Sequence, residues 1–141
     1  MFLLDTNVIS ELRRPDRADR HVLQWASAVG EPAQFLSSVT ILELEVGALS
    51  LKRRDERQGG SLWTWIRLTV LREFAGRILP FTVDTSLLCA PLHVPDRRPQ
   101  RDAMIAATAL EHRLTVVTRN VRDFTSMGVP VLNPWESSGR T

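Results

Sequence analysis

The sequence contains a single cysteine, Cys89, and no apolar run that approaches the length of a membrane span. One cysteine excludes an internal disulfide framework, which favours a protein of the reducing cytoplasm. A membrane-spanning helix needs about 20 consecutive apolar residues, so no membrane partner is expected. The first residues also lack the basic and apolar segments of a signal peptide. We therefore expect a cytoplasmic location.

Several common catalytic arrangements are absent as well. The histidines at positions 21, 93 and 112 do not have the spacing of metal ligands, so a zinc site is not expected. No Ser-His-Asp or Cys-His arrangement is apparent, and no Gly-rich loop of the kind that cradles phosphates is present. Neither nucleophilic catalysis of these kinds nor a phosphate-binding loop therefore competes with a site built from acidic side chains.

The remaining composition is that of an ordinary globular protein, with 43% hydrophobic and 24% charged residues. A length of 141 residues suits one core, so we expect a single domain over residues 1–141. The net charge is only +2, but the basic residues are nearly all arginine, whose planar fork suits phosphate. Charged runs usually form solvated faces, but three arginine-rich stretches also suggest an RNA-binding rim: 13–20, 52–57 and 97–101.

Apolar patterning predicts strands that alternate with helices. Strands are expected over residues 2–4, 35–39 and 115–118, with peripheral strands over 78–81 and 129–132. Helices are expected directly after Asp5 and over residues 40–51, 61–75, 85–92 and 100–112. Residues 52–60 are polar and end in two glycines, so they are expected to form a surface loop.

This alternation is typical of an α/β fold, here a three-layer α/β/α sandwich with a central parallel sheet. In such folds ligands bind just beyond the carboxyl ends of the strands. Asp5 comes directly after the first strand, and Asp123 lies just past the strand over 115–118. Glu43 and Asp102 are expected in the first turns of the helices over 40–51 and 100–112. Four acids are therefore expected at one edge of the sheet.

Each acid also has a purely structural interpretation. Asp5 could cap the first helix, and Thr40 and Glu43 have the spacing of a capping box. Asp102 could complement a helix dipole, and Asp123 could cap a final turn. These interpretations weaken because all four acids fall at the same edge.

Carboxylates that gather at one point repel each other and raise one another's pKa values. At an effective dielectric of about 20, two charges about 4 Å apart oppose each other by roughly 4 kcal/mol. A cation must neutralise such a cluster, and oxygen ligands without His or Cys favour Mg²⁺, with Mn²⁺ as a substitute. A carboxylate-bound ion of this kind suits phosphodiester hydrolysis, because it lowers the pKa of a bound water and neutralises phosphoryl charge.

Four short blocks resemble the signature motifs of PIN-domain proteins, most closely those of VapC toxins and their FitB-like relatives. They are LDTNVISE at residues 4–11, TILELEVG at 40–47, DAMIAATA at 102–109 and TRNVRDF at 118–124. The resemblance implies a PIN-like α/β/α sandwich and Mg²⁺-dependent endoribonuclease activity on RNA. It also implies neutralisation by a VapB-like antitoxin, a homodimer, and a larger toxin–antitoxin assembly.

The same resemblance implies roles for individual residues. The core metal ligands and the fourth acidic position, which together form the catalytic set, are matched by Asp5, Glu43, Asp102 and Asp123. Polar positions that line the site and would orient these ligands are matched by Thr6, Asn7, Thr118 and Asn120. Asn120 occupies a position that is Asp in some members, so either Asn120 or Asp123 would contact the metal through water.

Two rival interpretations fit parts of the sequence. An aspartyl-phosphate protein would use Asp5 as its nucleophile, but such sites usually need a lysine at the phosphate, and the only lysine, Lys52, lies in the expected loop. A non-catalytic module would use the acids to bind metal structurally, or would scaffold RNA or protein. A nuclease assay separates both from the ribonuclease interpretation.

The helix expected over residues 61–75 is explained by core packing, with one exception. Trp63 and Trp65 are two residues apart and cannot both face the same direction. One of them is therefore expected in a dimer or antitoxin groove.

Overall fold

The structure, a computed structural model, describes residues 1–136, so the expected domain boundary at residue 141 lies outside the described residues. Five strands form one sheet in the order β3-β2-β1-β4-β5, and every neighbouring pair is parallel. The strands are β1 (Phe2–Leu4), β2 (Gln34–Ser37), β3 (Ile78–Leu79), β4 (Thr115–Val117) and β5 (Val131–Leu132). The expected parallel sheet and its two peripheral strands are confirmed, and β2 begins one residue earlier and ends two residues earlier than predicted.

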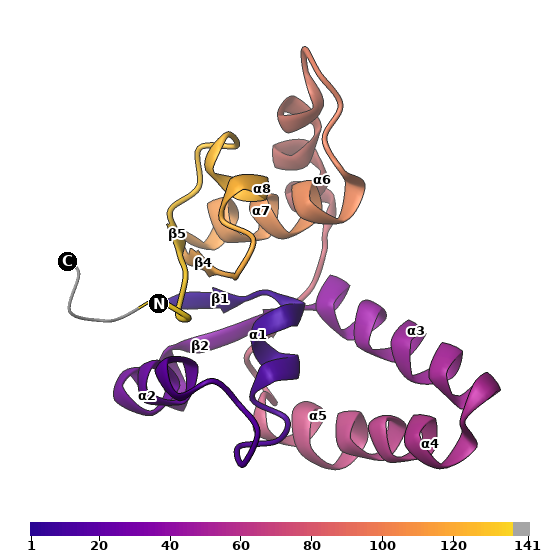
Figure 1. The fold of residues 1–141 in the computed structure, drawn as a ribbon. Helices are drawn as coiled ribbons and strands as arrows, with labels where there is room; N and C mark the ends of the chain where they lie inside the picture. The colour runs from indigo at the N-terminus through magenta and orange to yellow at the C-terminus, as the bar shows by residue number, and fades with distance from the viewer. Residues whose placement is uncertain (137–141) are drawn as a thin grey trace.

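Helices fill the connections between the strands (Figure 1). Between β1 and β3 they are α1 (Thr6–Glu11), α2 (Arg20–Val29), the short η1 (Glu31–Ala33), α3 (Ser38–Arg54), α4 (Glu56–Trp65), the π-helical η2 (Ile66–Val70) and α5 (Leu71–Glu73). After β3 they are α6 (Val83–Cys89), η3 (Ala90–His93), α7 (Gln100–His112) and α8 (Arg122–Thr125). The prediction for α7 is confirmed residue for residue, whereas α2 was not predicted.

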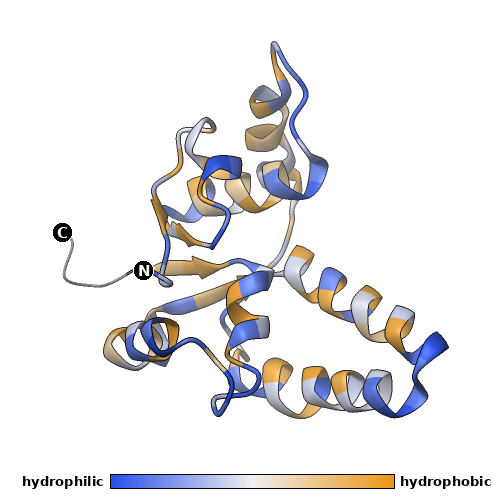
Figure 2. Ribbon diagram, in the orientation of Figure 1, coloured by the Kyte–Doolittle hydropathy of each residue, from blue (hydrophilic) through white to orange (hydrophobic). Residues whose placement is uncertain are grey.

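The two faces of the sheet bury two separate clusters, as the three-layer prediction requires. Leu3 and Val116 contact one cluster, which includes the alanine-rich face of α7 and Phe124 of α8. The next residue on each strand, Leu4 and Val117, points the other way because strand side chains alternate. That second cluster is formed with α1, α2, α3 and the α4–α5 segment, and Figure 2 shows apolar residues on the inward sides of these helices.

The strand order reverses beside β1. The chain moves from β1 outward to β2 and β3, and then returns to the other side of β1 to form β4. In open parallel sheets a ligand site forms at this kind of reversal, outside the carboxyl ends of the strands. The residues that leave β1 and β4 at this edge are Asp5 and Thr118.

The prediction of a loop over residues 52–60 is wrong. Helix α3 continues to Arg54, Asp55 caps the next helix by accepting from Gln58 N at 3.0 Å, and α4 begins at Glu56. Gly59 lies inside α4, where a Cβ atom would overlap the backbone of Lys52. The glycine therefore permits close packing of α3 against α4 rather than a flexible loop.

Helix α3 also begins earlier and faces differently than its pattern suggested. Its apolar residues Leu42, Val46 and Leu49 have the expected helical spacing, but they are 61%, 54% and 50% exposed. The buried side of α3 is formed by four other residues: Val39, Thr40, Leu44 and Ala48. The periodicity identified a helix but not the face that it buries.

The segment after β3 follows its prediction with shifted ends. Helix α6 starts at Val83 behind a capping box of Thr82 and Thr85, and at Ala90 it gives way to the 3-10 turn that contains Pro91. Across the described helices, none combines the length and hydrophobicity that crossing a membrane would require.

Candidate active site

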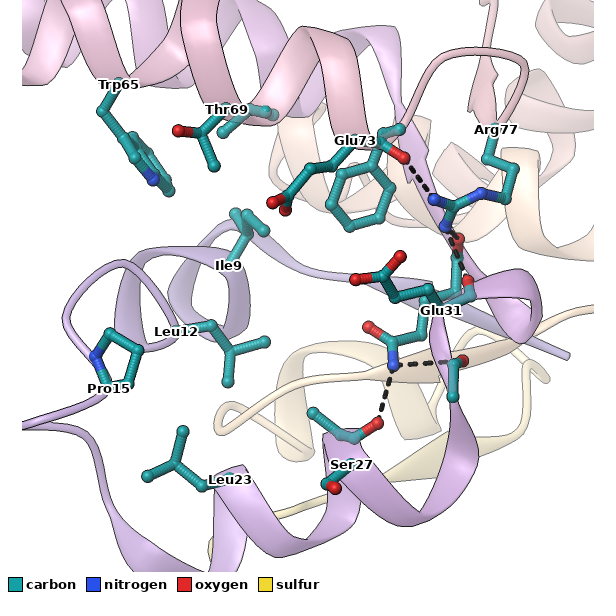
Figure 3. Close-up of a pocket in the computed structure, with 15 residues that line it drawn as sticks. Ile9, Leu12, Pro15, Leu23, Ser27, Glu31, Trp65, Thr69, Glu73 and Arg77 are labelled. Carbon is teal, nitrogen blue, oxygen red and sulfur yellow. Dashed lines mark hydrogen bonds between the residues drawn. The ribbon is translucent and has the colours of Figure 1, made fainter.

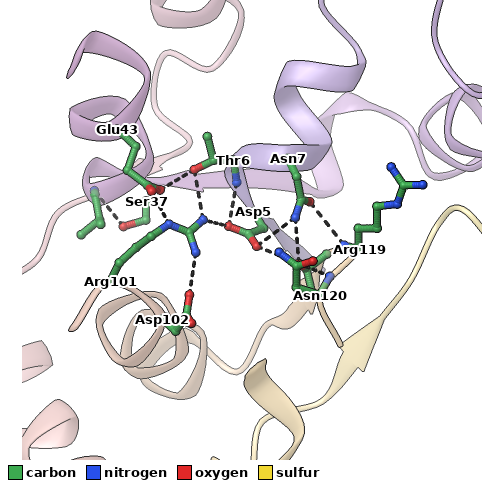
Figure 4. A network of polar contacts seen from close by, with 11 residues as sticks. Asp5, Thr6, Asn7, Ser37, Glu43, Arg101, Asp102, Arg119 and Asn120 are labelled. Atoms are coloured by element: carbon green, nitrogen blue, oxygen red, sulfur yellow. Dashed lines mark hydrogen bonds and ion pairs between the residues drawn. The ribbon is translucent and has the colours of Figure 1, made fainter. Parts of the chain in front are cut away.

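Asp5 occupies the end of β1, and its side chain is fully buried. Oxygen Oδ1 accepts from the backbone N of Thr6 at 2.8 Å, so the carboxylate caps α1 as one interpretation proposed. Oxygen Oδ2 accepts from Thr118 Oγ1 at 2.7 Å. A buried carboxylate with fixed hydrogen bonds to both oxygens has a defined orientation, and Figure 4 shows it at the centre of a polar network.

The Thr118 hydroxyl is the second fixed point of this network. It donates to Asp5 and accepts from Asn7 Nδ2 at 3.3 Å and from the backbone N of Asn120 at 3.0 Å. One donor and two acceptor positions are all that a hydroxyl has, so this side chain is fully used. Asn7 Oδ1 also accepts from the backbone N of Arg119 at 3.3 Å, which ties the end of β1 to the chain leaving β4.

Glu43 reaches the same place from α3. Its Oε1 accepts from Thr6 Oγ1 at 2.5 Å, and its Oε2 accepts from Arg101. The capping-box interpretation is wrong, because Ser37 caps α3 and Glu43 lies in the second turn of the helix rather than the first. The glutamate is therefore free of a capping role, and its carboxylate contacts Thr6 and Arg101.

Asp102 lies in the first turn of α7 and is 6% exposed. Its Oδ1 accepts from Arg101 Nη1 at 2.6 Å, and its side chain makes no capping hydrogen bond. Burial raises the pKa of Asp102, the charges of Asp123 and Asp5 raise it further, and Arg101 opposes them. The pKa of Asp102 is raised overall, chiefly because the carboxyl group is buried.

Asp123 and Asn120 lie beside this group. Asp123 is in the first turn of α8, and its charge acts on Asp102, although no hydrogen bond joins it to the other acids. Asn120 reaches the network through its backbone N–H rather than through its side chain. Both residues line an open depression of about 390 Å³, together with Arg119, Arg122 and Asn133.

The prediction from sequence missed Arg101, which was assigned with its neighbours to an RNA-binding rim. The guanidinium instead lies among the acids and donates from Nε to Glu43, from Nη1 to Asp102 and from Nη2 to Asp5. It also donates to Thr6 Oγ1 at 3.3 Å. The available signal was its position directly before Asp102 in the first turn of a helix that starts at the acidic edge.

The arrangement bears on the expected metal ion. As the side chains stand, no three His, Cys, Asp or Glu residues within residues 1–136 are arranged to hold an ion. Each of the three guanidinium nitrogens instead contacts a different carboxylate. The donors themselves fit a hard divalent ion, because all are oxygens and all already converge on one positive group.

Comparison with known proteins identifies the family. The PIN domain model matches residues 2–129. The chain is 38% identical to VapC ribonuclease Y4jK of Sinorhizobium fredii, over 96% of this chain and 99% of that protein. It is 36% identical to toxin FitB of Neisseria gonorrhoeae, over 96% of this chain and 99% of that protein.

Solved structures agree with this assignment. FitAcB from Neisseria gonorrhoeae superposes with a TM-score of 0.87 at 35% identity, covering 97% of this chain and 100% of that one. A toxin–antitoxin complex from Klebsiella pneumoniae superposes with a TM-score of 0.66 at 29% identity, covering 97% and 100% of the two chains. From its sequence motifs, its sheet and these relatives, the chain belongs to the PIN-domain family.

Proposed function

We propose that this protein is a Mg²⁺-dependent endoribonuclease that hydrolyses RNA phosphodiester bonds with a metal-activated water, and that it acts as a toxin neutralised by a cognate VapB-like antitoxin. One observation carries the proposal. Three carboxylates from distant segments converge on the Arg101 guanidinium at the carboxyl edge of the sheet: those of Asp5, Glu43 and Asp102. The relatives named VapC ribonuclease and toxin FitB support the activity and the role. A cytoplasmic location belongs to the same proposal.

The metal site follows from the donor set. Asp5, Glu43 and Asp102 would hold the ion, and Asp123 would complete the acidic set. PIN-domain ribonucleases generally use divalent metal ions, and an all-oxygen set favours Mg²⁺, with Mn²⁺ as a substitute. When bound, such an ion supplies an activated water and neutralises charge on the phosphoryl oxygens.

The surrounding polar residues hold the ligands in place. Thr118 fixes Asp5 Oδ2, the backbone of Thr6 fixes Asp5 Oδ1, and the Thr6 hydroxyl fixes Glu43. Carboxylates positioned in this way lose little further freedom when they bind an ion or a substrate. Asn7 supports the same arrangement through Thr118, and Asn120 does so through its backbone.

The test is cleavage of total RNA by purified protein with Mg²⁺ or with EDTA. Asp5→Asn is expected to reduce cleavage by at least about 100-fold, because a catalytic ion supplies several kcal/mol of transition-state stabilisation. Asp16→Asn, which changes an exposed aspartate, is the matched control and is expected to cleave normally. Circular dichroism verifies that both variants fold. Undiminished cleavage by Asp5→Asn, or cleavage that EDTA does not affect, would reject the metal-dependent mechanism. Absence of cleavage by the unmodified protein with Mg²⁺ would favour a non-catalytic module.

An apolar cavity offers a place for the antitoxin. It has a volume of about 370 Å³ and lies between α1, α2 and the α4–α5 segment (Figure 3). Its apolar lining includes Ile9, Leu12, Leu23, Trp65 and Phe74. Glu31, Glu73 and Arg77 also line it, and two carboxylates against one guanidinium leave an excess of negative charge. The cavity therefore suits a segment with apolar side chains and a basic residue at one end. We propose this cavity as the antitoxin site on the basis of its lining; the complex from Klebsiella pneumoniae supports only the presence of an antitoxin partner.

Introducing a bulky charge into the cavity tests that assignment. Thr69→Arg is expected to prevent co-purification with the VapB-like protein expected from the neighbouring reading frame, without loss of RNA cleavage. Thr64→Arg, on the exposed side of α4, is the matched control. Retention of the antitoxin by Thr69→Arg would place its binding site elsewhere.

A second apolar surface suits the proposed homodimer. Leu42, Val46 and Leu49 on α3 are exposed at helical spacing. In a two-fold dimer the same patch meets itself, so an apolar face of this kind is self-complementary. Val46→Glu is expected to yield a monomer in size-exclusion chromatography with light scattering. Leu68→Glu, which changes an equally exposed residue of η2, serves as the control; a dimer that survives Val46→Glu contradicts this surface.

A further inference from the structure

Arg101 is held in the acidic cluster by more partners than any other cationic side chain in the described part of the chain. It donates to three carboxylates that come from β1, α3 and α7, and to one hydroxyl (Figure 4). Its own side chain is only 31% exposed, while the side chains of Asp5 and Asp102 are 0% and 9% exposed. The guanidinium therefore closes the carboxylate group from the solvent side.

The electrostatics of the cluster keep this arginine charged. Burial works against the charge, but Asp5 and Glu43 outweigh it, and the pKa of Arg101 is raised above its usual value. Its single positive charge faces three carboxylates, so the cluster retains an excess of negative charge even with the arginine in place. A doubly charged ion would neutralise the same oxygens more fully.

The guanidinium and a divalent ion cannot use these oxygens together. Glu43 Oε2, Asp102 Oδ1 and Asp5 Oδ1 each accept from a different nitrogen of Arg101, so one oxygen of every proposed ligand is already in use. An ion bound between them would repel the guanidinium as well as replace its hydrogen bonds. The arginine reaches the cluster from the start of α7 and remains partly exposed, so it can leave toward solvent without disturbing the core.

We propose that Arg101 is the resident cation of the metal-free site, which competes with the divalent ion for the carboxylates and thereby sets the ion concentration at which the site fills. This inference rests on the proposed function, because it assumes that the three carboxylates are the metal ligands. It adds an intramolecular competitor to that function. At low divalent-ion concentration the arginine occupies the site and the enzyme is inactive.

The experiment measures Mn²⁺ binding by electron paramagnetic resonance, without RNA, on the full chain. Removing the competitor in Arg101→Gln is expected to tighten Mn²⁺ binding by about tenfold or more, since charge-assisted hydrogen bonds no longer oppose the ion. Arg101→Lys, which keeps the charge but not the three-pronged geometry, is expected to bind with intermediate affinity. Arg97→Gln, at an exposed arginine of the same segment, is the matched control and is expected to bind like the unmodified chain.

Thermal unfolding provides a second readout that does not depend on a tight ion complex. With EDTA, Arg101→Gln is expected to melt below the unmodified chain, because its three carboxylates lose their counterion. With saturating Mn²⁺ it is expected to gain more in Tm than the unmodified chain does. If Arg101→Gln does not fold without metal, both Mn²⁺ binding and thermal unfolding are measured on Arg101→Lys.

The outcomes separate the two proposals. Equal or weaker Mn²⁺ binding by both Arg101 variants overturns the inference, while the metal site survives if Asp5→Asn still abolishes binding. Absence of Mn²⁺ binding in every variant, or binding that Asp5→Asn leaves intact, overturns the metal site and with it the inference.

Discussion

Two arginines of this protein bind different numbers of carboxylates: Arg67 binds one and Arg101 binds three. Arg67, in η2, donates to both oxygens of Glu45 on α3, at 2.9 and 2.5 Å, and its guanidinium lies 3.7 Å from the ring centroid of Trp63. Its hydrogen bonds lower the pKa of Glu45, as expected for one cation matched to one anion. Arg101 is instead shared among three carboxylates, and burial raises the pKa of Asp102 although that carboxyl group contacts the arginine.

The difference separates a structural ion pair from a functional cluster. A matched pair can tie two helices together and leaves no charge unsatisfied. A cluster with an excess of negative charge costs stability, so its presence favours a role in binding a cation. Because Glu43 and Glu45 are two residues apart on α3, the two arrangements can be compared on the same helix.

The largest expected contrast is in RNA cleavage. Glu43→Gln is expected to lower Mg²⁺-dependent cleavage by at least about 100-fold, because it removes one of the proposed metal ligands. Glu45→Gln is expected to leave the cleavage rate unchanged, because its partner Arg67 lies outside the acidic cluster. Rates of single-turnover RNA cleavage measure both. Equal losses in the two variants would mean that α3 as a whole, rather than the cluster, supports activity.

A smaller loss is expected from the residue that orients the most buried acid. Thr118→Val removes the donor to Asp5 Oδ2 and the acceptor for Asn7 and Asn120, and supporting contacts of this kind are worth about 10- to 100-fold in metal affinity or activity. Thr115→Val, at the other end of β4, is the control and is expected to be active. Mn²⁺ titration of both variants shows whether the loss arises in metal affinity. An active Thr118→Val variant would show that Asp5 needs no such support.

The acidic edge could be predicted from sequence because it depends on chain order alone. Asp5 follows a buried strand directly, and the start of α7 is fixed by Pro99 and by the alanine face that follows it. Parallel strands then bring the segments to one edge whatever their separation in sequence. The direction of the Arg101 side chain could not be predicted in the same way, because Arg97 and Arg98 beside it share its residue type but not its surroundings.

The errors in the α3–α4 region have a related cause. Gly59 and Gly60 are typical of loops when read alone, and only the position of Lys52 on the opposing helix shows that Gly59 is needed for close packing. Likewise, α3 carries apolar residues on two sides, so its periodicity could not show that Leu44 is buried while Val46 is exposed. Both properties depend on a partner surface, which local sequence does not describe.

The stability of the α3–α4 region, which includes the Arg67–Glu45 pair, is expected to depend on the close packing at Gly59. In Gly59→Ala the new Cβ meets the Lys52 backbone, which cannot move away as a flexible side chain could, and overpacking of this kind costs about 1–3 kcal/mol. Gly60 is the next residue of α4, and a Cβ atom there would meet open space. Gly60→Ala is therefore expected to stabilise the folded protein by about 0.5–1 kcal/mol. Urea unfolding of the two variants measures the change in the free energy of unfolding, which is expected to have opposite signs. A stabilised Gly59→Ala variant would show that the helices separate without cost.

The smallest expected effects are also the most direct test of the comparison, because they differ in sign. In EDTA at neutral pH, Asp102→Asn is expected to raise the Tm by a few degrees: burial, Asp123 and Asp5 raise the pKa of Asp102, so the folded state penalises its charged form. Glu45→Gln is expected to lower the Tm by a few degrees, because the lowered pKa of Glu45 means that the folded state favours its charge. Adding Mn²⁺ should reverse the first effect, since the ion then loses a ligand, and should leave the second unchanged. If both variants lost stability in EDTA, Arg101 would neutralise the carboxylates of its cluster as fully as Arg67 neutralises Glu45. The carboxylates at the sheet edge would then have a structural role only.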